Sequence, residues 1–402
     1  MEGKNLKIGL FGFGVVGQGL YEVLLQSPRL KAVIGKICIR DSRKERSLDQ
    51  TLFTVDRDVI LNDPSINVVV ELIDDSDAAY EIVSASLKKG KAVVSANKKM
   101  IAHHFDELCE LQRKHDVPLL YEAACCASIP IIRNLEEYYD NDLLEYIEGI
   151  VNGSTNYILT KVFSENKSYP EALKEAQEKG YAESDPILDT GGFDAKYKLV
   201  IMIAHAFGIV ANPEEVFNCG INSIGDLELN YAREKGLKIK LIAQAYKSPT
   251  GIISCMVMPK FVDKHSILYG VDDVFNGIIT RTTFSDRQFF VGKGAGAYPT
   301  ASAVLADISA LSYDYRYEYK KLTQHPDCEL EANPRLKMFL RHSKKDAEAL
   351  KACFDDVAES YLNHNAGYII GDISLDRVKE ISANYSDDVS FVLFERISNA
   401  VL

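Results

Sequence analysis

The sequence predicts an α/β protein built from three consecutive parts, each with its own pattern of strands and helices. Residues 1–130 alternate apolar strands with amphipathic helices, which is typical of a parallel, doubly wound sheet. Residues 131–299 contain several neighbouring strand patterns, which favour an α+β domain with an open mixed sheet. Residues 325–402 follow a Pro-containing linker and show the order βαββαβ, which predicts a small ferredoxin-like module.

The periodicity of the first two parts gives the expected bounds of their elements. Strands of the first part are expected at 6–11, 32–39, 67–73, 91–95 and 117–121. Its helices are expected at 15–26, 77–89 and 102–115. The second part should begin with a helix at 131–139 and have strands at 144–151, 237–247, 251–259, 276–282 and 285–291. In a doubly wound sheet, ligands bind over the carboxyl ends of the strands.

A glycine-rich turn joins the first strand to the first helix. Gly12 permits a tight turn, Gly14 lets the backbone approach a pyrophosphate, and Gly17 lets the helix pack close to the strand. The N-terminus of the following helix presents N–H groups that bind phosphate oxygens. Because strand, glycines and helix occur in this order, the segment predicts a Rossmann-type dinucleotide-binding domain, with Phe13 and Val16 also beside the cofactor.

Charged residues after the second strand bear on the choice of cofactor. Arg40 can hold a ribose 2′-phosphate by a bidentate, charge-assisted contact, which favours NADP(H). Asp41 can instead accept a hydrogen bond from the 2′-hydroxyl of NAD(H). A solvated turn without a role in binding is a third interpretation. We expect NADP(H) to be preferred, with NAD(H) also accepted.

One acidic loop in the second part is the most informative segment of the chain. It contains Glu183, Asp189 and Asp194, and a helical pattern begins where it ends. Asp194 and Lys198 are then i,i+4 neighbours in the first turns of that helix. Acids on a rigid loop beside a lysine suit a small substrate that carries an amino group and a carboxylate. The alternative is a solvated acidic loop followed by an ordinary ion pair.

Two further strand ends carry candidate residues. The segment at 95–99 reads Ser-Ala-Asn-Lys-Lys and follows a strand, which places Lys98 at the carboxyl edge of the sheet. The segment at 152–156 reads Asn-Gly-Ser-Thr-Asn, and a turn there would offer N–H groups and hydroxyls to a substrate carboxylate. Both segments are therefore predicted to contribute to ligand binding.

Five segments together resemble the homoserine dehydrogenase family, and the resemblance covers most of residues 6–310. The segments lie at 12–17, 95–99, 152–159, 180–198 and 292–304. The loop at 180–198, with its Gly-Tyr-Ala-Glu-Ser-Asp-Pro-Ile-Leu-Asp sequence, is the most specific of them. The resemblance implies an NAD(P)-dependent, reversible reduction of L-aspartate 4-semialdehyde to L-homoserine, a step in threonine, methionine and isoleucine biosynthesis.

The resemblance also implies roles for individual residues, with Lys198 the first candidate for the proton donor and Lys98 the second. The implied substrate-binding residues are Glu183, Asp189, Asp194, Tyr181, Gly153 and Ser154. The implied cofactor-binding residues are Gly12, Phe13, Gly14, Val16, Gly17, Arg40, Ser95, Lys98, Gly180 and Gly296. A sodium ion is implied at the backbone of Glu122, Cys125, Ala127 and Ile129.

The resemblance has consequences for the assembly as well. It implies that the helix at 300–320 packs back on the first part, and that the far face of the mixed sheet pairs two subunits in a homodimer or higher homo-oligomer. The tail also has the element order of an ACT regulatory module, but the glycine turn expected after its first strand is absent. We therefore expect a degenerate, ACT-like module with a structural or oligomer-forming role.

Two other functions remain open at this point. Cys125 and Cys126 precede a helix, so they can be interpreted as nucleophiles of a cysteine-dependent semialdehyde dehydrogenase or as small buried thiols. A nucleotide-binding regulatory protein with a vestigial site is the other alternative, and the intact Lys98 and Lys198 argue against it. His205 is expected to be a helix histidine with satisfied hydrogen bonds.

Composition narrows the class of partners. The net charge at pH 7 is −12, which disfavours nucleic acid and anionic membranes as partners. No apolar run approaches the ~18 residues of a membrane span, and the N-terminus shows no signal peptide and leaves no room for a fused aspartate kinase domain. The 8 cysteines show no zinc spacing and are expected to be reduced. We expect a cytoplasmic enzyme with a small-molecule substrate.

Overall fold

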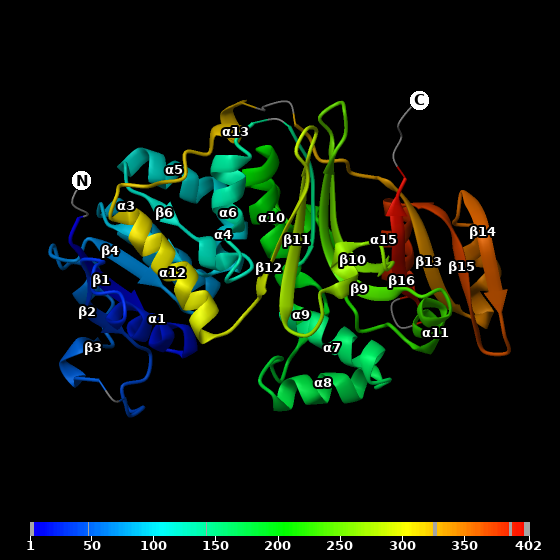
Figure 1. Ribbon diagram of the computed structural model, residues 1–402, viewed down its shortest axis with the longest axis horizontal. Coiled ribbons are helices and arrows are strands. Elements are labelled where there is room, and N and C mark those ends of the chain that lie inside the picture. Colours follow the sequence, from blue (N-terminus) through cyan, green and yellow to red (C-terminus); the bar gives the residue numbers. More distant parts are fainter. Residues whose placement is uncertain (1–3, 47, 142, 325–327, 386–387, 398–402) are drawn as a thin grey trace. The chain divides into compact units, whose positions relative to one another are not determined.

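The chain folds into two compact units, which Figure 1 shows in a computed structural model. The structure describes residues 4–46, 48–141, 143–324, 328–385 and 388–397. The first unit consists of residues 1–142, 200–213 and 292–326, and the second consists of residues 143–199, 214–291 and 327–402. Among the helices of the described residues, none has the length and apolar character needed to cross a membrane.

A parallel sheet forms the centre of the first unit, with the strand order β3-β2-β1-β4-β5-β6. Its strands are β1 (Leu6–Phe11), β2 (Ala32–Cys38), β3 (Phe53–Thr54), β4 (Val68–Glu71), β5 (Ala92–Ser95) and β6 (Leu119–Leu120). All neighbouring strands run parallel, which confirms the predicted doubly wound, Rossmann-like sheet. The short edge strand β3 was not predicted.

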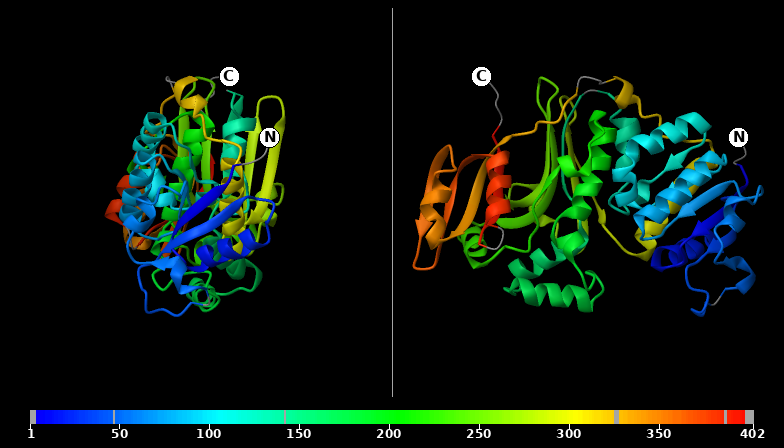
Figure 2. Two further views of the ribbon diagram at one scale, coloured as in Figure 1. Left: turned by 90° about the vertical axis from the view of Figure 1, so that its left-hand side faces the viewer. Right: turned by 180° about the vertical axis from the view of Figure 1, so that it is seen from behind.

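Helices cover both faces of this sheet (Figure 2). The helices of this unit are α1 (Val15–Leu25), α2 (Asp58–Leu61), α3 (Ser76–Lys88), α4 (Lys98–His103), α5 (Phe105–His115), α6 (Ile131–Arg133), α12 (Ala297–Leu311) and α13 (Lys320–Gln324). The helix predicted at 102–115 is two helices, because His104 leaves helical geometry with φ −118° and ψ 23°. α12 packs against α1, where a Cβ on Gly19 would lie 3.0 Å from the Ala297 carbonyl oxygen.

A mixed sheet forms the centre of the second unit, as predicted, with the order β12-β11-β7-β9-β10-β16-β13-β15-β14 and β8 beside β10. Its first strands are β7 (Leu144–Ile150), β8 (Phe217–Asn218), β9 (Lys238–Lys247), β10 (Ile253–Val262), β11 (Phe275–Thr282) and β12 (Asp286–Lys293). Its last strands are β13 (Arg335–Ser343), β14 (Asp356–Leu362), β15 (Ala366–Ser374) and β16 (Ser390–Arg396). The contacts of β10 with β8 and β16 are parallel, and the other pairs described are antiparallel.

The tail shows the predicted βαββαβ order, but it is not a sheet of its own. Its strand β16 pairs with β10, where Leu393 lies opposite Lys260. The segment before β13 also bonds to β10, because the Ile253 N–H donates to the Glu329 carbonyl and the Glu331 N–H donates to the Ile253 carbonyl. The third part predicted at 325–402 is therefore continuous with the sheet of the second. Backbone pairing between distant strands leaves no trace in the pattern of either strand alone.

The second unit contains helices that were predicted and helices that were not. The predicted ones are α10 (Phe193–Phe207), α14 (Ala347–Lys351) and α15 (Leu375–Asn384). The others are α7 (Gly153–Ser164), α8 (Tyr169–Glu178), α9 (Ile187–Thr190) and α11 (Asp226–Glu234). α10 starts in the second unit and belongs to the first from residue 200 onward. The turn predicted at 152–156 is wrong, because Gly153 already begins α7.

Candidate active site

Lys198 lies in the first part of α10, and its side chain is buried beside Asp194. Its Nζ donates to Asp194 Oδ2 at 2.6 Å and to the Val151 carbonyl oxygen at 2.7 Å. The exposed fractions are 9% for the Lys198 side chain and 6% for that of Asp194. Exposed i,i+4 pairs contribute little, whereas removing one partner of a buried pair is costly. The geometry therefore disfavours the interpretation of an ordinary solvated ion pair.

Asn152 connects this pair to a second acid. Its Nδ2 donates to Asp194 Oδ2 at 2.9 Å and to Asp189 Oδ1 at 2.7 Å. Its Oδ1 accepts from the Thr155 N–H at 2.8 Å, so Asn152 also caps the N-terminus of α7. Asn152 was not among the individual site residues predicted from the sequence. An asparagine before a helix start does signal a cap, but the acids it bonds are revealed only by the tertiary structure.

The charges of this cluster favour a cationic group on the ligand. Burial and the negative charge of Asp194 raise the pKa of Asp189. With both carboxylates ionised, the cluster of Asp189, Asp194 and Lys198 has a net charge of −1. A substrate ammonium placed beside the two acids would lower their mutual repulsion.

The start of α7 lies beside the acidic loop. Ser154 Oγ donates to the Tyr181 carbonyl oxygen at 2.5 Å. A Cβ on Gly153 would lie 2.9 Å from the Val274 carbonyl oxygen, so the backbone approach at this position requires glycine. Although the predicted turn is instead a helix, the first N–H groups of α7 have no carbonyl partner within the helix, and a helix N-terminus of this kind suits a carboxylate.

Glu183 and Gly180 belong to the exposed side of the same loop. The Glu183 side chain is exposed, and its backbone carbonyl accepts from Gln177 Nε2 at 2.9 Å. Gly180 is exposed and follows α8 with a φ of 71°. Within the described chain, the hydrogen bonds of the buried cluster do not include the Glu183 carboxylate. The proposed contacts of both residues remain predictions.

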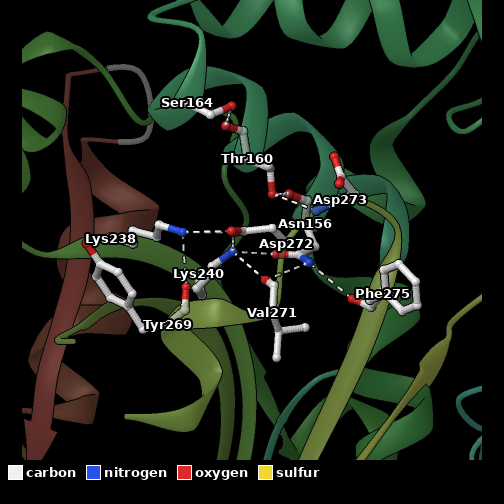
Figure 3. Close-up of polar contacts among 10 residues, drawn as sticks. All are labelled: Asn156, Thr160, Ser164, Lys238, Lys240, Tyr269, Val271, Asp272, Asp273 and Phe275. Atoms are coloured by element: carbon white, nitrogen blue, oxygen red, sulfur yellow. Dashed lines mark hydrogen bonds and ion pairs between the residues drawn. The ribbon is translucent and has the colours of Figure 1, made fainter. Parts of the chain in front are cut away.

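Figure 3 shows how a buried lysine fixes α7 to the loop before β11. Lys240 is 1% exposed, and its Nζ donates to Asn156 Oδ1 at 2.9 Å, to the Val271 carbonyl at 2.6 Å and to Asp272 Oδ1 at 2.9 Å. Asn156 Nδ2 donates to the carbonyls of Val271 and Phe275. Burial lowers the pKa of Lys240 to about 8, although Asp272 opposes this shift. These bonds hold the start of α7 in place.

The glycine-rich turn of the first unit has the geometry that a dinucleotide requires. Gly12 has a φ of 94°, and a Cβ there would lie 2.5 Å from the Leu72 carbonyl oxygen. A Cβ on Gly17 would lie 2.4 Å from the Gly12 carbonyl oxygen, so the helix can pack this close to the turn only with glycine at position 17. A Cβ on Gly14 would meet nothing within 4 Å, which leaves open space over the backbone at this position. These three environments match the roles predicted for a pyrophosphate site.

The two residues at the end of β2 differ in their surroundings. The Asp41 carboxylate accepts from the Arg43 N–H at 2.9 Å and from Arg43 Nε at 3.2 Å. The N–H bond and the Arg43 side chain lower the pKa of Asp41. Arg40 is exposed. Nearby, the Phe13 ring packs edge-on against Phe53, with 5.4 Å between the ring centroids.

Two other segments predicted to contact the cofactor lie in the first unit. Lys98 is the first residue of α4, which Asn97 caps by accepting from the Met100 N–H at 3.0 Å. Ser95 at the end of β5 is buried. Gly296 precedes α12 with a φ of 123°, a conformation that favours glycine.

The segment predicted to bind sodium forms a buried, tightly turned loop. The Glu122 carboxylate accepts from the N–H groups of Ile132 and Arg133 at 2.8 and 2.9 Å. Burial, with the negative charge of Asp307, raises the pKa of Glu122 to about 8. Cys126 and Ala127 both have left-handed backbone, with φ of 57° and 45°. The Glu122 side chain is thus engaged by α6, and the cation contacts predicted for this backbone remain predictions.

Cys125, Cys126 and His205 of the first unit lie in the protein interior. Cys125 and Cys126 are both buried. His205 is buried between Glu136 Oε2 at 2.7 Å and the Tyr121 hydroxyl at 2.9 Å, as predicted for a satisfied histidine. Among the described residues, no group of three or more His, Cys, Asp and Glu side chains is arranged to hold a metal ion.

Known proteins share both the sequence and the fold of this chain. The family description "Homoserine dehydrogenase" matches residues 130–309, and "Homoserine dehydrogenase, NAD binding domain" matches residues 12–122. The homoserine dehydrogenase of Lactococcus lactis subsp. lactis (strain IL1403) is 36% identical over 315 residues, covering 76% of this chain and 73% of that protein.

Solved structures extend the similarity to the tail. The structure of a homoserine dehydrogenase from Thiobacillus denitrificans matches 98% of this chain and 99% of its own, with a TM-score of 0.85 and 28% identity. A hyperthermophilic archaeal homoserine dehydrogenase in complex with NADPH matches 78% of this chain and 99% of its own, with a TM-score of 0.66 and 28% identity. The glycine-rich turn and the Lys198 cluster both lie inside the matched segments. The chain therefore belongs to the homoserine dehydrogenase family and is an oxidoreductase with an NAD-binding domain.

Proposed function

We propose that this enzyme catalyses the reversible, NAD(P)-dependent reduction of L-aspartate 4-semialdehyde to L-homoserine. The observation that carries the proposal is the buried cluster of Lys198, Asp194, Asn152 and Asp189. It combines an ammonium donor with acids that suit the amino group of a small amino-acid substrate. Such a reaction belongs to the cytoplasmic biosynthesis of threonine, methionine and isoleucine.

In this mechanism Lys198 moves a proton at the substrate oxygen. A nicotinamide held by the glycine-rich turn would supply the hydride chemistry at the substrate carbon. During reduction, negative charge develops on the aldehyde oxygen, and the Lys198 ammonium stabilises that charge and donates a proton to form the hydroxyl. During oxidation, the neutral Lys198 amine removes the hydroxyl proton. Asp194 and the Val151 carbonyl hold Nζ in position for both directions.

The remaining residues bind and orient the substrate. Asp189, Asp194 and Glu183 are the proposed partners of its ammonium group. Gly153 and Ser154 at the N-terminus of α7, with Tyr181, are the proposed contacts of its carboxylate. Lys98 is the second candidate for the proton donor and a contact of both substrate and cofactor.

NADP(H) is the preferred cofactor in this proposal, with NAD(H) also accepted. Arg40 is exposed where a 2′-phosphate would lie, whereas the Asp41 carboxylate is engaged by Arg43. The archaeal relative described in complex with NADPH supports the same choice. Gly12, Phe13, Gly14, Val16, Gly17, Ser95, Gly180 and Gly296 are the other proposed contacts of the cofactor.

A monovalent cation such as Na⁺ is proposed at the backbone of Glu122, Cys125, Ala127 and Ile129. The left-handed turn at 126–127 supports it, because such turns redirect successive carbonyl groups. Replacing NaCl by choline chloride at constant ionic strength tests the site, and an unchanged activity and thermal stability would contradict it.

We also propose that two copies of the chain pair through the second unit. Ile267, Phe275 and Val291 expose apolar side chains around a hollow of about 370 Å³ that Phe289 also lines. Apolar surface of this kind is typical of protein contacts. Light scattering tests the assembly, and a monomeric mass would contradict it.

The tail is proposed to be a degenerate ACT-like module that extends the sheet without an effector site.

An activity assay tests the proposed reaction directly. We expect the purified chain to form NADPH from L-homoserine and NADP⁺, more slowly from NAD⁺, and to leave L-serine, which is one carbon shorter, unchanged. Absence of homoserine oxidation with either cofactor would contradict the proposal. Phosphate-dependent oxidation of aspartate 4-semialdehyde would instead support a cysteine-dependent enzyme, an alternative that the buried Cys125 and Cys126 disfavour.

A further inference from the structure

A closed ring of hydrogen bonds joins the carboxyl ends of β4 and β5 in the first unit. The Glu71 carboxylate accepts from the Ser95 hydroxyl at 2.6 Å and from the Ile73 N–H at 2.7 Å. Ser95 Oγ accepts from the Asn97 N–H at 3.1 Å, and Asn97 Nδ2 donates to the Ile73 carbonyl at 3.1 Å. Glu71 and Ser95 are both buried and lie opposite each other in the sheet. The ring therefore fixes the two loops that follow these strands.

The same ring of hydrogen bonds fixes the backbone conformation before and after Lys98. Asn97 Oδ1 accepts from the Met100 N–H and caps α4, whose first residue is Lys98. The Lys98 N–H donates to the Ala96 carbonyl at 3.1 Å, and the Ala96 N–H donates to the Glu71 carbonyl at 3.3 Å. A change in the Glu71 side chain would thus alter the position of Lys98 through Ser95, Ala96 and Asn97.

Burying the Glu71 carboxylate costs free energy of folding. Burial raises the pKa of Glu71 to about 7, and the negative charge of Asp74 adds to the shift. Among the charged groups of the described chain, Asp74 is the one whose field raises the pKa of Glu71. The hydrogen bonds from Ser95 and Ile73 oppose this rise in pKa. An apolar side chain of similar size would avoid this cost, so the carboxylate must serve another purpose than packing.

The ring depends on the ionised form of Glu71. An ionised carboxylate only accepts, so every donor in the ring finds an acceptor. A protonated Glu71 carries an O–H donor, and where that O–H faces Ser95 Oγ, which already accepts from Asn97, the Ser95 hydroxyl hydrogen loses its acceptor. With the proton on the other oxygen, the bonds from Ser95 and Ile73 lose their charge-assisted strength. Protonation therefore loosens the ring.

We propose that Glu71 is a positioning residue, which holds Ser95 and Asn97 so that Lys98 is placed for the reaction. The inference rests on the role given to Lys98 under the proposed function. It adds that the ionised carboxylate is the active form, so that activity depends on the charge of a residue that touches neither substrate nor cofactor.

The Glu71→Gln variant tests this inference. Glutamine keeps the size of the side chain but is uncharged at every pH, and its NH₂ group must face either the Ser95 hydroxyl or the Ile73 N–H, so one acceptor of the ring is lost. In the reductive direction Lys198 acts in its protonated form, so its own titration does not lower the rate at acid pH. In the wild type, kcat/KM for reduction of L-aspartate 4-semialdehyde should therefore fall as pH decreases through about 7. In Glu71→Gln this acid limb should be absent, and kcat/KM at about pH 8 should be ~10–100-fold lower, the scale of a small misplacement. The NADPH dissociation constant should change little.

A matched control uses Glu228, a buried glutamate of the second unit that pairs with Arg341. Glu228→Gln should keep the wild-type pH profile. Loss of the acid limb in this control as well, or an unchanged profile in Glu71→Gln, would overturn the proposal. If Glu71→Gln does not fold, Ser95→Ala breaks the same ring, and wild-type kcat with a wild-type pH profile would overturn it.

A double-variant comparison separates the inference from the proposed function. Lys98→Ala should lower kcat, and adding Glu71→Gln to Lys98→Ala should lower it no further. Independent, additive losses would overturn the positioning role while leaving that of Lys98 intact. Wild-type turnover of Lys98→Ala would refute the role of Lys98 and, with it, this inference.

Discussion

Arg40 and Asp41 are adjacent in the sequence but have different electrostatic environments. Asp41 is held in its own turn by two hydrogen bonds from Arg43, whereas Arg40 extends into solvent at the end of β2. An exposed guanidinium at this position can bind a phosphate in a bidentate manner. The choice between NADP(H) and NAD(H) is therefore expected to depend on one side chain.

The Arg40→Ala variant tests this expectation. Loss of a charge-assisted contact costs ~1.5–3 kcal/mol, or roughly one to two decades in the NADPH dissociation constant. NADH lacks the 2′-phosphate, so its dissociation constant should change little. Lys44→Ala removes a neighbouring exposed charge and serves as the control. Equal losses for both cofactors, or none for either, would show that Arg40 does not bind the 2′-phosphate.

At the residue scale, sequence reasoning predicted pairs that lie within one helix but not those that join distant segments. The i,i+4 spacing of Asp194 and Lys198 predicted their contact, which the structure confirms. The bonds of Asn152 to Asp189 and of Glu71 to Ser95 connect residues that are far apart in the sequence. No periodicity encodes such bonds, because they depend on how separate elements pack.

At the scale of elements, α7 links the fold of the second unit to the proposed substrate site. Its N-cap, Asn152, bonds to both acids of the cluster. Its next turn is bonded through Asn156 to Lys240, Val271 and Phe275. Lys240 thus stabilises the helix start from a buried position that is not itself part of the cluster.

The Lys240→Met variant tests the importance of this anchor. Methionine fills similar space but leaves the Asn156 and Val271 oxygens without their ammonium donor, so we expect a loss of ~1–3 kcal/mol in the free energy of unfolding. The KM for homoserine should rise, whereas the NADPH dissociation constant should not. Urea denaturation and steady-state kinetics measure these changes.

Lys238→Met provides the matched control for Lys240. Lys238 bonds to Asp272 and to the Tyr269 carbonyl but makes no bond to α7 that the structure describes. Its loss should cost less than ~1 kcal/mol, as for other partly exposed pairs, and should leave the KM for homoserine unchanged. Equal effects of the two variants would contradict the anchoring role of Lys240.

Elements with a strong hydrophobic period were predictable, and several connections between them were not. β1, α1 and β9 appear where apolar periodicity placed them. The segment at 152–164 was predicted to begin as a turn because its Asn-Gly-Ser sequence is typical of turns, but these residues cap and start α7 instead. Local polar residues are compatible with both structures, and tertiary packing decides between them.

At the scale of the whole molecule, each unit carries one half of the proposed reaction. The first unit presents the glycine-rich turn at the carboxyl edge of a parallel sheet, and the second presents the Lys198 cluster beside a mixed sheet. The parallel sheet and the mixed sheet were both predictable from strand patterns. The continuity of the tail with β10 was not, because it depends on backbone bonds between β10 and β16.

The central claim is that Lys198 transfers the proton in homoserine oxidation, and kcat of the Lys198→Met variant tests it most directly. Lys196→Met is the matched control, because Lys196 is also buried and lies on the same helix, with its Nζ 5.2 Å from the centre of the Phe193 ring. Both variants should be checked for folding and for an unchanged NADPH dissociation constant. The account predicts that kcat falls ~10²–10⁴-fold in Lys198→Met and remains near the wild-type value in Lys196→Met. Near-normal turnover of folded Lys198→Met, or equal losses in the two variants, would contradict it.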